Sequence, residues 1–159
     1  MVTICHNSEQ LKKSYLLNQK MPHSFVNIWI HAVWATKYRE PMICDDFEDK
    51  LYTFIYFQLK SMGCAVRIVN GMPDHVHCLF SLSRQLSIAA VLKQVKGASS
   101  RFVNANKFTP QNFKWQNGYS VFSVSPKDTD RVYKYIKFQK WHHRNIDYEN
   151  ELERFSIFT

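Results

Sequence analysis

The chain has no cysteine framework, no long apolar run and no glycine-rich phosphate loop. Its four cysteines form no Cys-x-x-Cys pair, and Cys44, Cys64 and Cys78 lie in apolar or strand-like surroundings, so we expect buried, reduced thiols. No segment reaches the length of a membrane span, and residues 1–20 lack the apolar core of a secretion signal. These features predict a cytoplasmic protein that does not associate with a membrane. A GxxxxGK sequence is also missing, so we expect no nucleotide cofactor.

Acidic residues are missing from one third of the chain. The whole sequence of 159 residues has 21 Lys and Arg against 13 Asp and Glu, a formal net charge of +8. Between Asp74 and Asp128 every charged side chain is a cation: Arg84, Lys93, Lys96, Arg101, Lys107, Lys114 and Lys127. A solvated helix face normally mixes both signs, so this bias favours a phosphate-binding surface over a merely soluble one. We therefore expect a nucleic-acid partner.

The length and composition fit a single domain. With 159 residues and 45% hydrophobic residues, the chain can form one ordinary core, and it contains no internal repeat. Residues 1–20 are polar apart from a short LKKSYLL patch, whereas a strongly patterned segment begins at Met21. We expect an N-terminal extension at 1–20 and one domain at 21–159.

The first half of that domain predicts a strand, a helix and a hairpin. Residues 24–36 are rich in Val, Ile, Trp and Phe, which is typical of a central strand. Asp45 and Asp46 are expected to cap and charge the start of a helix that ends at Gly63. The runs CAVRIVNG and DHVHCLFSL then predict two strands joined by a short turn.

The second half predicts a helix, a strand and a final helix. Ser87 is placed to cap the first of these helices, and YSVFSVS predicts the strand. Ser125, followed by Pro126, predicts the start of a long helix that runs to about Arg144. The complete order is that of an α+β, ferredoxin-like (split βαβ) antiparallel sheet with an added C-terminal helix. This fold serves many functions and does not decide among them.

His75 and His77 flank Val76 in the second strand of the hairpin. Because side chains alternate along a strand, both imidazoles point to one face. They could share a divalent cation that stabilises charge in a phosphoryl displacement, or they could be two polar surface residues. Asp74 could orient one imidazole as a carboxylate behind the ligand, or could cap the turn. His31, on the neighbouring strand, could approach the metal or be a hydrogen-bonded core residue.

Tyr135 and Gln139 stand one turn apart in the run VYKYIKFQKWHH. If their shared face lies against the histidine strand, Gln139 offers a third ligand and Tyr135 a nucleophile, which could form a phosphotyrosine that keeps the energy of the broken DNA linkage. Tyr135 could equally fill a helix-sheet interface. Tyr133 is a competing nucleophile, but its spacing from Gln139 turns it to another face. His142 and His143 could be further ligands or ordinary cations near the helix end, and we favour the second interpretation.

These residues resemble the HUH-type single-tyrosine transposases of the smallest bacterial insertion sequences and their REP-associated domesticated relatives. The matching segments extend over nearly all of the chain after Met21: HAVWATKYREPMI, GMPDHVHCLF, LKQVKGASSRFVN, FKWQNGYSVFSVS and VYKYIKFQKWHH. Family members often have Asn before the Gln, where this chain has Phe138.

The resemblance implies a homodimer that recognises hairpins in single-stranded DNA at the ends of an insertion sequence. It also implies a 5′-phosphotyrosine at Tyr135, a free 3′-hydroxyl, and Mg²⁺ or Mn²⁺ held by His75, His77 and Gln139. In such dimers the tyrosine helix can serve the partner's histidines. By charge and helix position, the candidate DNA contacts are Lys93, Lys96 and Arg101.

Three other functions stay open. A ferredoxin-like sheet can bind nucleic acid without catalysis. A domesticated relative could process chromosomal palindromes, or a replication initiator could use the same chemistry. A structural zinc protein would unfold on chelation.

Overall fold

The computed structural model describes residues 26–142, so the predicted extension at 1–20 lies outside the described part. The elements follow one another in this order: β1 (Trp29–Ala35), η1 (Lys37–Arg39), α2 (Glu48–Ser61), β2 (Ala65–Met72), β3 (His75–Ser81), α3 (Ile88–Ala105), β4 (Ser120–Val124), η2 (Pro126–Asp128), α4 (Thr129–Lys137) and α5 (Gln139–His142).

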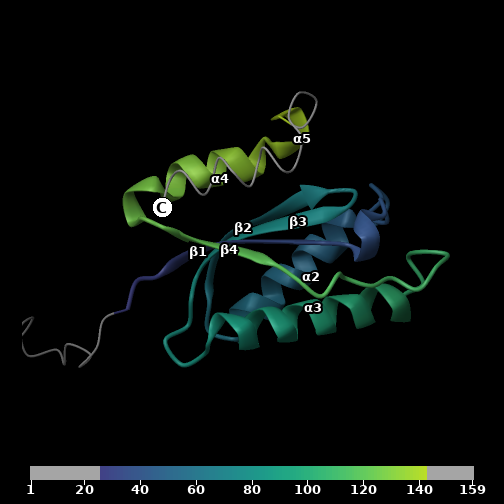
Figure 1. Cartoon of the computed structure of the whole chain (residues 1–159), viewed down its shortest axis with the longest axis horizontal. Coiled ribbons are helices and arrows are strands. Elements are labelled where there is room, and N and C mark those ends of the chain that lie inside the picture. The colour runs from purple at the N-terminus through teal and green to yellow at the C-terminus, as the bar shows by residue number, and fades with distance from the viewer. Residues whose placement is uncertain (1–25, 143–159) are drawn as a thin grey trace, which may run out of the picture.

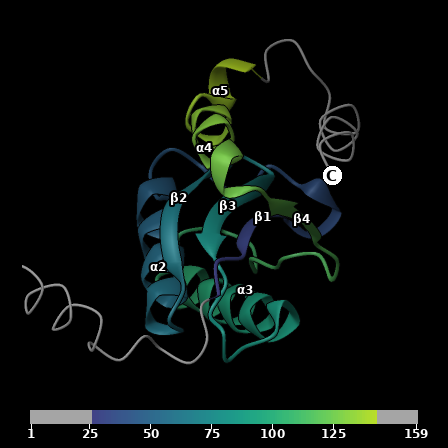
Figure 2. The ribbon, with the colours of Figure 1, turned by 90° about the vertical axis from the view of Figure 1, so that its left-hand side faces the viewer.

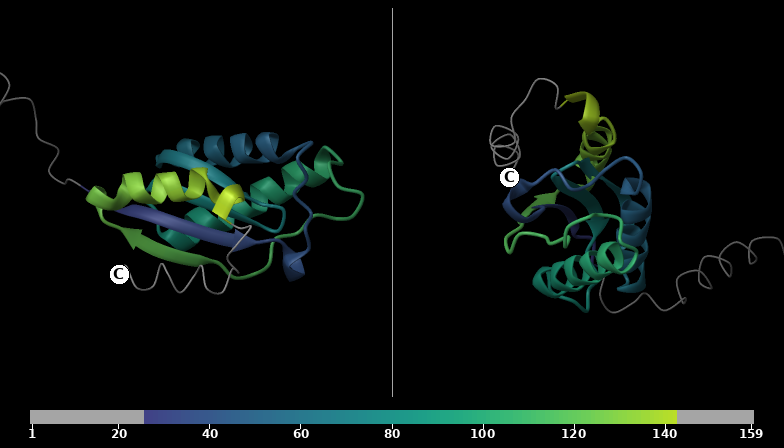
Figure 3. Two further views of the ribbon diagram at one scale, coloured as in Figure 1. Left: turned by 90° about the horizontal axis from the view of Figure 1, so that it is seen from above. Right: turned by 90° about the vertical axis from the view of Figure 1, so that its right-hand side faces the viewer.

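The four strands form one antiparallel sheet in the order β2-β3-β1-β4. This order and the two crossover helices confirm the predicted ferredoxin-like fold. Helices α2 and α3 cover one face of the sheet, and α4 and α5 lie over the other, as Figures 1 and 2 show from two directions. The sheet is therefore a middle layer, with α4 on the face opposite the main core (Figure 3).

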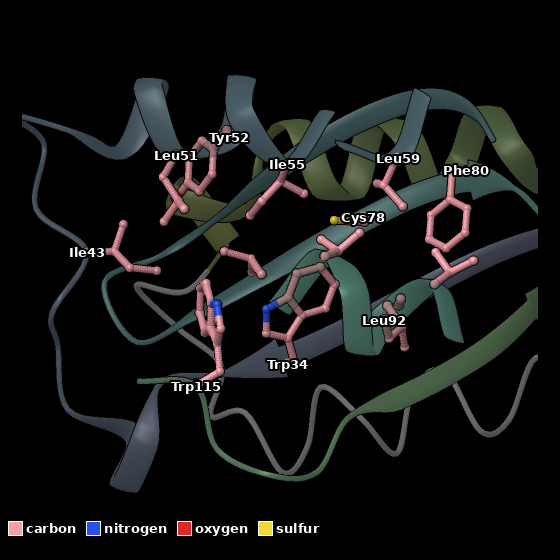
Figure 4. Packing of buried hydrophobic residues seen from close by; sticks show 14 of the residues in the cluster. Trp34, Ile43, Leu51, Tyr52, Ile55, Leu59, Cys78, Phe80, Leu92 and Trp115 are labelled. Atoms are coloured by element: carbon pink, nitrogen blue, oxygen red, sulfur yellow. The ribbon is translucent and has the colours of Figure 1, made fainter. Parts of the chain in front are cut away.

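Alternation along the strands divides the side chains between these two faces. Trp34, Cys78 and Phe80 pack on the α2 and α3 side in the main core, together with Leu51 and Leu92 from the helices (Figure 4). The strand residues that alternate with these point to the α4 side. There Leu79 packs with Val132 and Ile136 in a smaller apolar cluster. Each strand thus buries apolar groups on both faces, which fixes its register.

Two aromatic residues of the segment between α3 and β4 belong to the main core. Phe113 is fully buried, and Trp115 stands edge-on to Trp34 with ring centroids 5.9 Å apart. Ser99 on α3 accepts a hydrogen bond of 2.9 Å from the Trp115 indole, and Asn104 exchanges two hydrogen bonds with the Phe113 backbone. This segment therefore packs firmly along α3.

Several local expectations need correction. The final helix is not continuous, because it is broken at Phe138 between α4 and α5, and a short η2 turn precedes α4. Ser125 makes no side-chain cap, whereas Ser87 does cap α3, through a hydrogen bond of 3.2 Å from the Ala90 amide. Helix α2 begins at Glu48 without a side-chain cap, so Asp45 and Asp46 precede it. Cys64 and Cys78 are buried as expected, but Cys44 is exposed.

Strand β2 holds α4 in place at both ends. Arg67 donates a hydrogen bond of 2.9 Å to Thr129 and pairs with Asp130 at 2.8 Å. At the other end Asn70 donates to the carbonyl of Ile136 at 2.8 Å, where the helical hydrogen bonds end. The helix is therefore fixed along the strand that neighbours the histidines.

Candidate active site

His75 and His77 lie side by side on β3, on the face that α4 and α5 cover. Both are buried, with 1% and 0% of their surface exposed, which rules out the alternative that they are polar surface residues. Their ring centroids are 5.0 Å apart. Gly71 permits the close approach of β2, because a Cβ there would meet the backbone carbonyl of His75. The predicted placement of both imidazoles on one face is confirmed.

The imidazole of His75 is oriented by Asp74. Its Nδ1 lies 2.6 Å from Oδ1 of Asp74, and Arg39 donates to the other carboxylate oxygen at 2.5 Å. Burial opposes the charge of this carboxylate, but its hydrogen bond with His75 and the neighbouring Arg39 outweigh burial and hold the pKa of Asp74 below its ordinary value. A carboxylate at Nδ1 keeps the proton on that nitrogen, so the Nε2 lone pair of His75 is available as a ligand.

His31 has the corresponding position behind His77. Its Nε2 lies 2.9 Å from Nδ1 of His77, and the two rings stack with centroids 5.1 Å apart. Burial lowers the pKa of His31 to about 3, so its imidazole is neutral at neutral pH. A neutral His31 can accept the Nδ1 proton of His77 and leave the Nε2 of His77 as the ligand atom. His31 is therefore a hydrogen-bonded core residue, as one of the two sequence alternatives stated.

Tyr135 and Gln139 reach the histidines from the opposite layer. Nε2 of Gln139 lies 3.1 Å from Nε2 of His75, and Gln139 is fully buried. The Tyr135 ring stands edge-on to His77 at 6.1 Å between centroids. Tyr133 instead lies beside Arg67 at 5.5 Å, away from the histidines. The geometry thus brings Tyr135, and not its competitor, to the histidine pair of the same chain.

The break at Phe138 gives Gln139 its own support. Lys140 forms an ion pair of 2.5 Å with Glu48 on α2, whose hydrogen bond raises the pKa of the lysine. Asn70 contacts the carbonyls of Ile136 and Lys137 just before the break. The short helix α5 is therefore tied to α2 while α4 is tied to β2, and Gln139 begins α5 between these two attachments.

The donor set fits a divalent cation with open positions. The Gln139 amide lies against Nε2 of His75, and the His77 ring lies 5.0 Å from the His75 ring. A half-turn of the amide exchanges its nitrogen for a carbonyl oxygen. Among the described residues no three His, Cys, Asp or Glu side chains gather to hold a metal.

Replacing Asp74 by asparagine tests its position behind His75. We expect Mn²⁺ affinity to fall by roughly tenfold to a hundredfold, because an amide no longer fixes the Nδ1 proton. Isothermal titration with Mn²⁺ measures this directly. The control is Asp130→Asn, which also removes a carboxylate paired with an arginine but lies at the far end of α4. Equal Mn²⁺ affinity in Asp74→Asn and wild type would contradict the role.

The candidate phosphate contacts differ in their surroundings. Lys93 and Arg101 are exposed on α3. Lys96 is half-buried and donates to the carbonyls of Gln116, Asn117 and Gly118, at 2.8, 3.3 and 2.8 Å, while burial lowers its pKa. These three acceptors use all its N–H donors, so Lys96 fits a role in holding this loop better than the predicted phosphate contact.

An open hollow of about 390 Å³ lies between α3 and the segment before β4. Lys93, Lys96 and Lys114 line it together with Trp115 and Tyr119. Cationic and aromatic side chains from the acid-free segment 75–127 thus line the same hollow.

Within residues 26–142 no helix is long and apolar enough to cross a membrane. His143 lies outside the described residues, so its expected role as a helix-end cation stays a prediction.

The sequence is similar to that of known proteins. Residues 24–139 match the family of IS200-like transposases. The ISDra2 transposase TnpA of Deinococcus radiodurans is 31% identical over 114 residues, which cover 69% of this chain and 81% of the relative. A transposase for insertion sequence element IS200 from Salmonella typhimurium is 24% identical over 127 residues, 76% of this chain and 82% of the relative.

Two solved structures share the fold. The crystal structure of a Deinococcus radiodurans protein assigned as a transposase superposes with a TM-score of 0.61 at 28% identity, over 76% of this chain and 97% of that one. A REP-associated tyrosine transposase bound to a REP hairpin superposes with a TM-score of 0.55 at 16% identity, over 79% of this chain and 74% of that one. The chain belongs to the family of IS200-like transposases, which are DNA-cleaving enzymes.

Proposed function

We propose that this transposase cleaves and rejoins single-stranded DNA at insertion-sequence ends through a covalent bond to Tyr135. One observation carries the proposal: Tyr135 and Gln139 face the buried pair His75 and His77 of the same chain. A hydroxyl nucleophile and a ligand set for a cation therefore meet in one place. Two buried imidazoles with separate orienting partners are costly to maintain for packing alone.

The proposed step is a transesterification. The Tyr135 oxygen attacks phosphorus and forms a 5′-phosphotyrosine, the bond from phosphorus to the 3′-oxygen breaks, and the phenolic proton is lost while the 3′-oxygen is protonated. One phosphodiester replaces another, so no nucleotide hydrolysis is needed. In the reverse direction a 3′-hydroxyl attacks the phosphotyrosine and rejoins the strands. The edge-on contact with His77 and the attachment of α4 to Asn70 hold Tyr135 for this attack.

We propose His75, His77 and Gln139 as ligands of one Mg²⁺ or Mn²⁺. When bound, the cation supplies a Lewis acid that neutralises charge on the phosphoryl oxygens. Asp74 and His31 keep protons on the Nδ1 atoms, so both Nε2 atoms face the ligand position. Imidazole ligands alone would favour Mn²⁺ or Zn²⁺, whereas a hard phosphate oxygen as a further ligand favours Mg²⁺ or Mn²⁺.

The proposed partners are a hairpin in single-stranded DNA and a second copy of the chain. A hairpin ligand is supported by the structural relative that is bound to a REP hairpin. A cationic surface is supported by Lys93, Arg101 and Lys114, which lie in the acid-free third of the sequence. The homodimer rests on the family resemblance, and we propose that residues 21–159 form its single domain.

A binding module without catalysis is less consistent with this geometry. Such modules of the same fold read nucleic acid with aromatics on an open sheet face. Here α4 and α5 cover that face (Figure 1), and His75 and His77 are buried. Processing of chromosomal palindromes requires the same site, so only the DNA that flanks the gene distinguishes that role from transposition.

The proposal is tested with end-labelled single-stranded DNA from the flanks of the gene. The protein is incubated with it in Mg²⁺ or Mn²⁺, and the products are separated on a denaturing gel. We expect a labelled band that migrates with the protein and disappears with chelator. Tight DNA binding without such a band in either metal would instead favour the non-catalytic module.

Lys93→Gln and Arg101→Gln should weaken binding to all DNA sequences alike. Each substitution should flatten the slope of log affinity against log salt concentration by about 0.7, because binding of the variant releases one fewer counterion from the single strand. Lys96→Met, the comparison variant, should leave that slope unchanged and lower the free energy of unfolding by about 1–3 kcal/mol, since three carbonyls lose their donor. Filter binding at several salt concentrations and urea melts measure the two effects. A flattened slope in Lys96→Met alone would contradict this assignment.

A further inference from the structure

Tyr38 is presented to solvent on a strained backbone. It follows β1 in the short turn η1, and 77% of its surface is exposed, more than for any other large apolar or aromatic side chain in the described part of the chain. Its φ is 58°, and that of Arg39 is 57°. A left-handed backbone conformation at two successive residues other than glycine costs free energy, which the surrounding contacts must offset. Neither packing nor backbone preference explains a tyrosine here.

The turn that carries Tyr38 is held rigidly. The Thr36 hydroxyl donates to the carbonyl of Glu40 at 2.6 Å, and the Thr36 amide donates to that of Asp74 at 2.8 Å. The Lys37 amide donates to the carbonyl of Lys114 at 2.8 Å. The backbone that carries the Tyr38 ring is therefore fixed in place.

That place is next to the candidate active site. Arg39 is the immediate neighbour of Tyr38 and binds Asp74, which orients His75. The Lys37 ammonium lies 4.7 Å from the Tyr38 ring centroid, and Lys114 is exposed on the adjoining segment. An aromatic ring, two exposed or half-exposed cations and the histidine pair thus lie at the same end of the central strands β1 and β3.

We propose that Tyr38 is a stacking platform for an unpaired base of single-stranded DNA that flanks the cleaved phosphate, with Lys37 and Lys114 at the adjacent backbone phosphates. This inference rests on the proposed function. An exposed ring beside cations is the arrangement that binds single strands, because every base offers a face for stacking whatever its sequence. A paired base has no free face, so the platform selects unpaired DNA. Tyr38 is accordingly a substrate-positioning residue, and not a part of the metal site.

The test compares Tyr38→Asn with Tyr38→Trp and Phe57→Ala. Asparagine suits the left-handed backbone and removes the ring, so the fold is kept or strengthened. Tryptophan keeps a stacking face. Phe57 is a matched control, since 61% of its surface is exposed and it lies on α2, across the sheet from the site. The probes are single-stranded oligonucleotides from the gene's flanks, in which 2-aminopurine replaces one base at a time.

Tyr38→Asn should lower single-strand affinity about tenfold without lowering the melting temperature. At one 2-aminopurine position it should also abolish the fluorescence quenching that wild type and Tyr38→Trp produce. Affinity equal to that of wild type and Phe57→Ala would overturn the proposal. A changed oligomeric state in Tyr38→Asn with unchanged DNA affinity would also overturn it and assign the ring to a protein interface. Quenching does not require cleavage, so failure of the covalent chemistry in wild type would be seen separately.

Discussion

Tyr135→Phe should abolish the covalent protein-DNA complex and lower strand cleavage by roughly a thousandfold or more, while single-strand binding should stay within about twofold of wild type. The physical reason is that phenylalanine keeps the ring that packs beside His77 and Ile136 but lacks the attacking oxygen. The measurement is the labelled band on a denaturing gel, together with filter binding of the same DNA.

The matched control is Tyr133→Phe. Tyr133 lies on the same helix but beside Arg67, so loss of its hydroxyl should leave the covalent band in place. If the band persisted in Tyr135→Phe and vanished in Tyr133→Phe, the nucleophile would be assigned wrongly. If both variants kept it, neither tyrosine would be the attacking residue.

His77→Ala should lower Mn²⁺ affinity by about a hundredfold or more and should remove metal-dependent cleavage, because His77 is a proposed ligand of the cation. Removing a ligand should lower the metal affinity more than removing a residue that orients a ligand, which lowers it by roughly tenfold to a hundredfold. His75→Ala should behave alike, because the two Nε2 atoms face the same position. Isothermal titration with Mn²⁺ and the cleavage assay measure the effect.

Leu79→Ala separates metal binding from packing in this experiment. Leu79 is the next residue of β3 on the same face and belongs to the apolar cluster under α4. Its truncation should lower the free energy of unfolding by about 2–5 kcal/mol and leave Mn²⁺ affinity in the folded protein nearly unchanged. Unchanged Mn²⁺ affinity in His77→Ala would remove the basis for the metal site.

Residue composition and turn residues predicted most of the fold, because each strand is rich in β-branched and aromatic residues. In the segment 75–81, residues with opposite parity enter different apolar clusters, as expected of a strand. The same alternation placed His75 and His77 together. Tyr135 and Gln139 also reach the predicted face, although the helix is broken at Phe138 between them.

The break at Phe138 could not be predicted from the sequence. The run around it keeps helical spacing and contains no Gly or Pro. Its causes are distant in the chain, since Asn70 on β2 binds the carbonyls before the break and Glu48 on α2 binds Lys140 after it. Tertiary contacts thus override local helix propensity here.

Partners that act across the sheet were also hidden. His31 lies 46 residues from His77, and only the pairing of β1 with β3 brings them together. The sequence shows Lys96 only as a cation. The three carbonyls that accept its hydrogen bonds belong to a loop about 20 residues away. Charge and spacing identify candidates, whereas burial and hydrogen-bond partners decide which are available to DNA.

The most direct test of the account is to identify the amino acid that carries the DNA. Wild-type protein is trapped with its flanking single strand in Mn²⁺ and digested with trypsin and nuclease, and the nucleotide-bearing peptide is sequenced by mass spectrometry. The account predicts a single nucleotide adduct on Tyr135. An adduct on Tyr133 or on any serine, or DNA cleavage with no adduct at all, would contradict it.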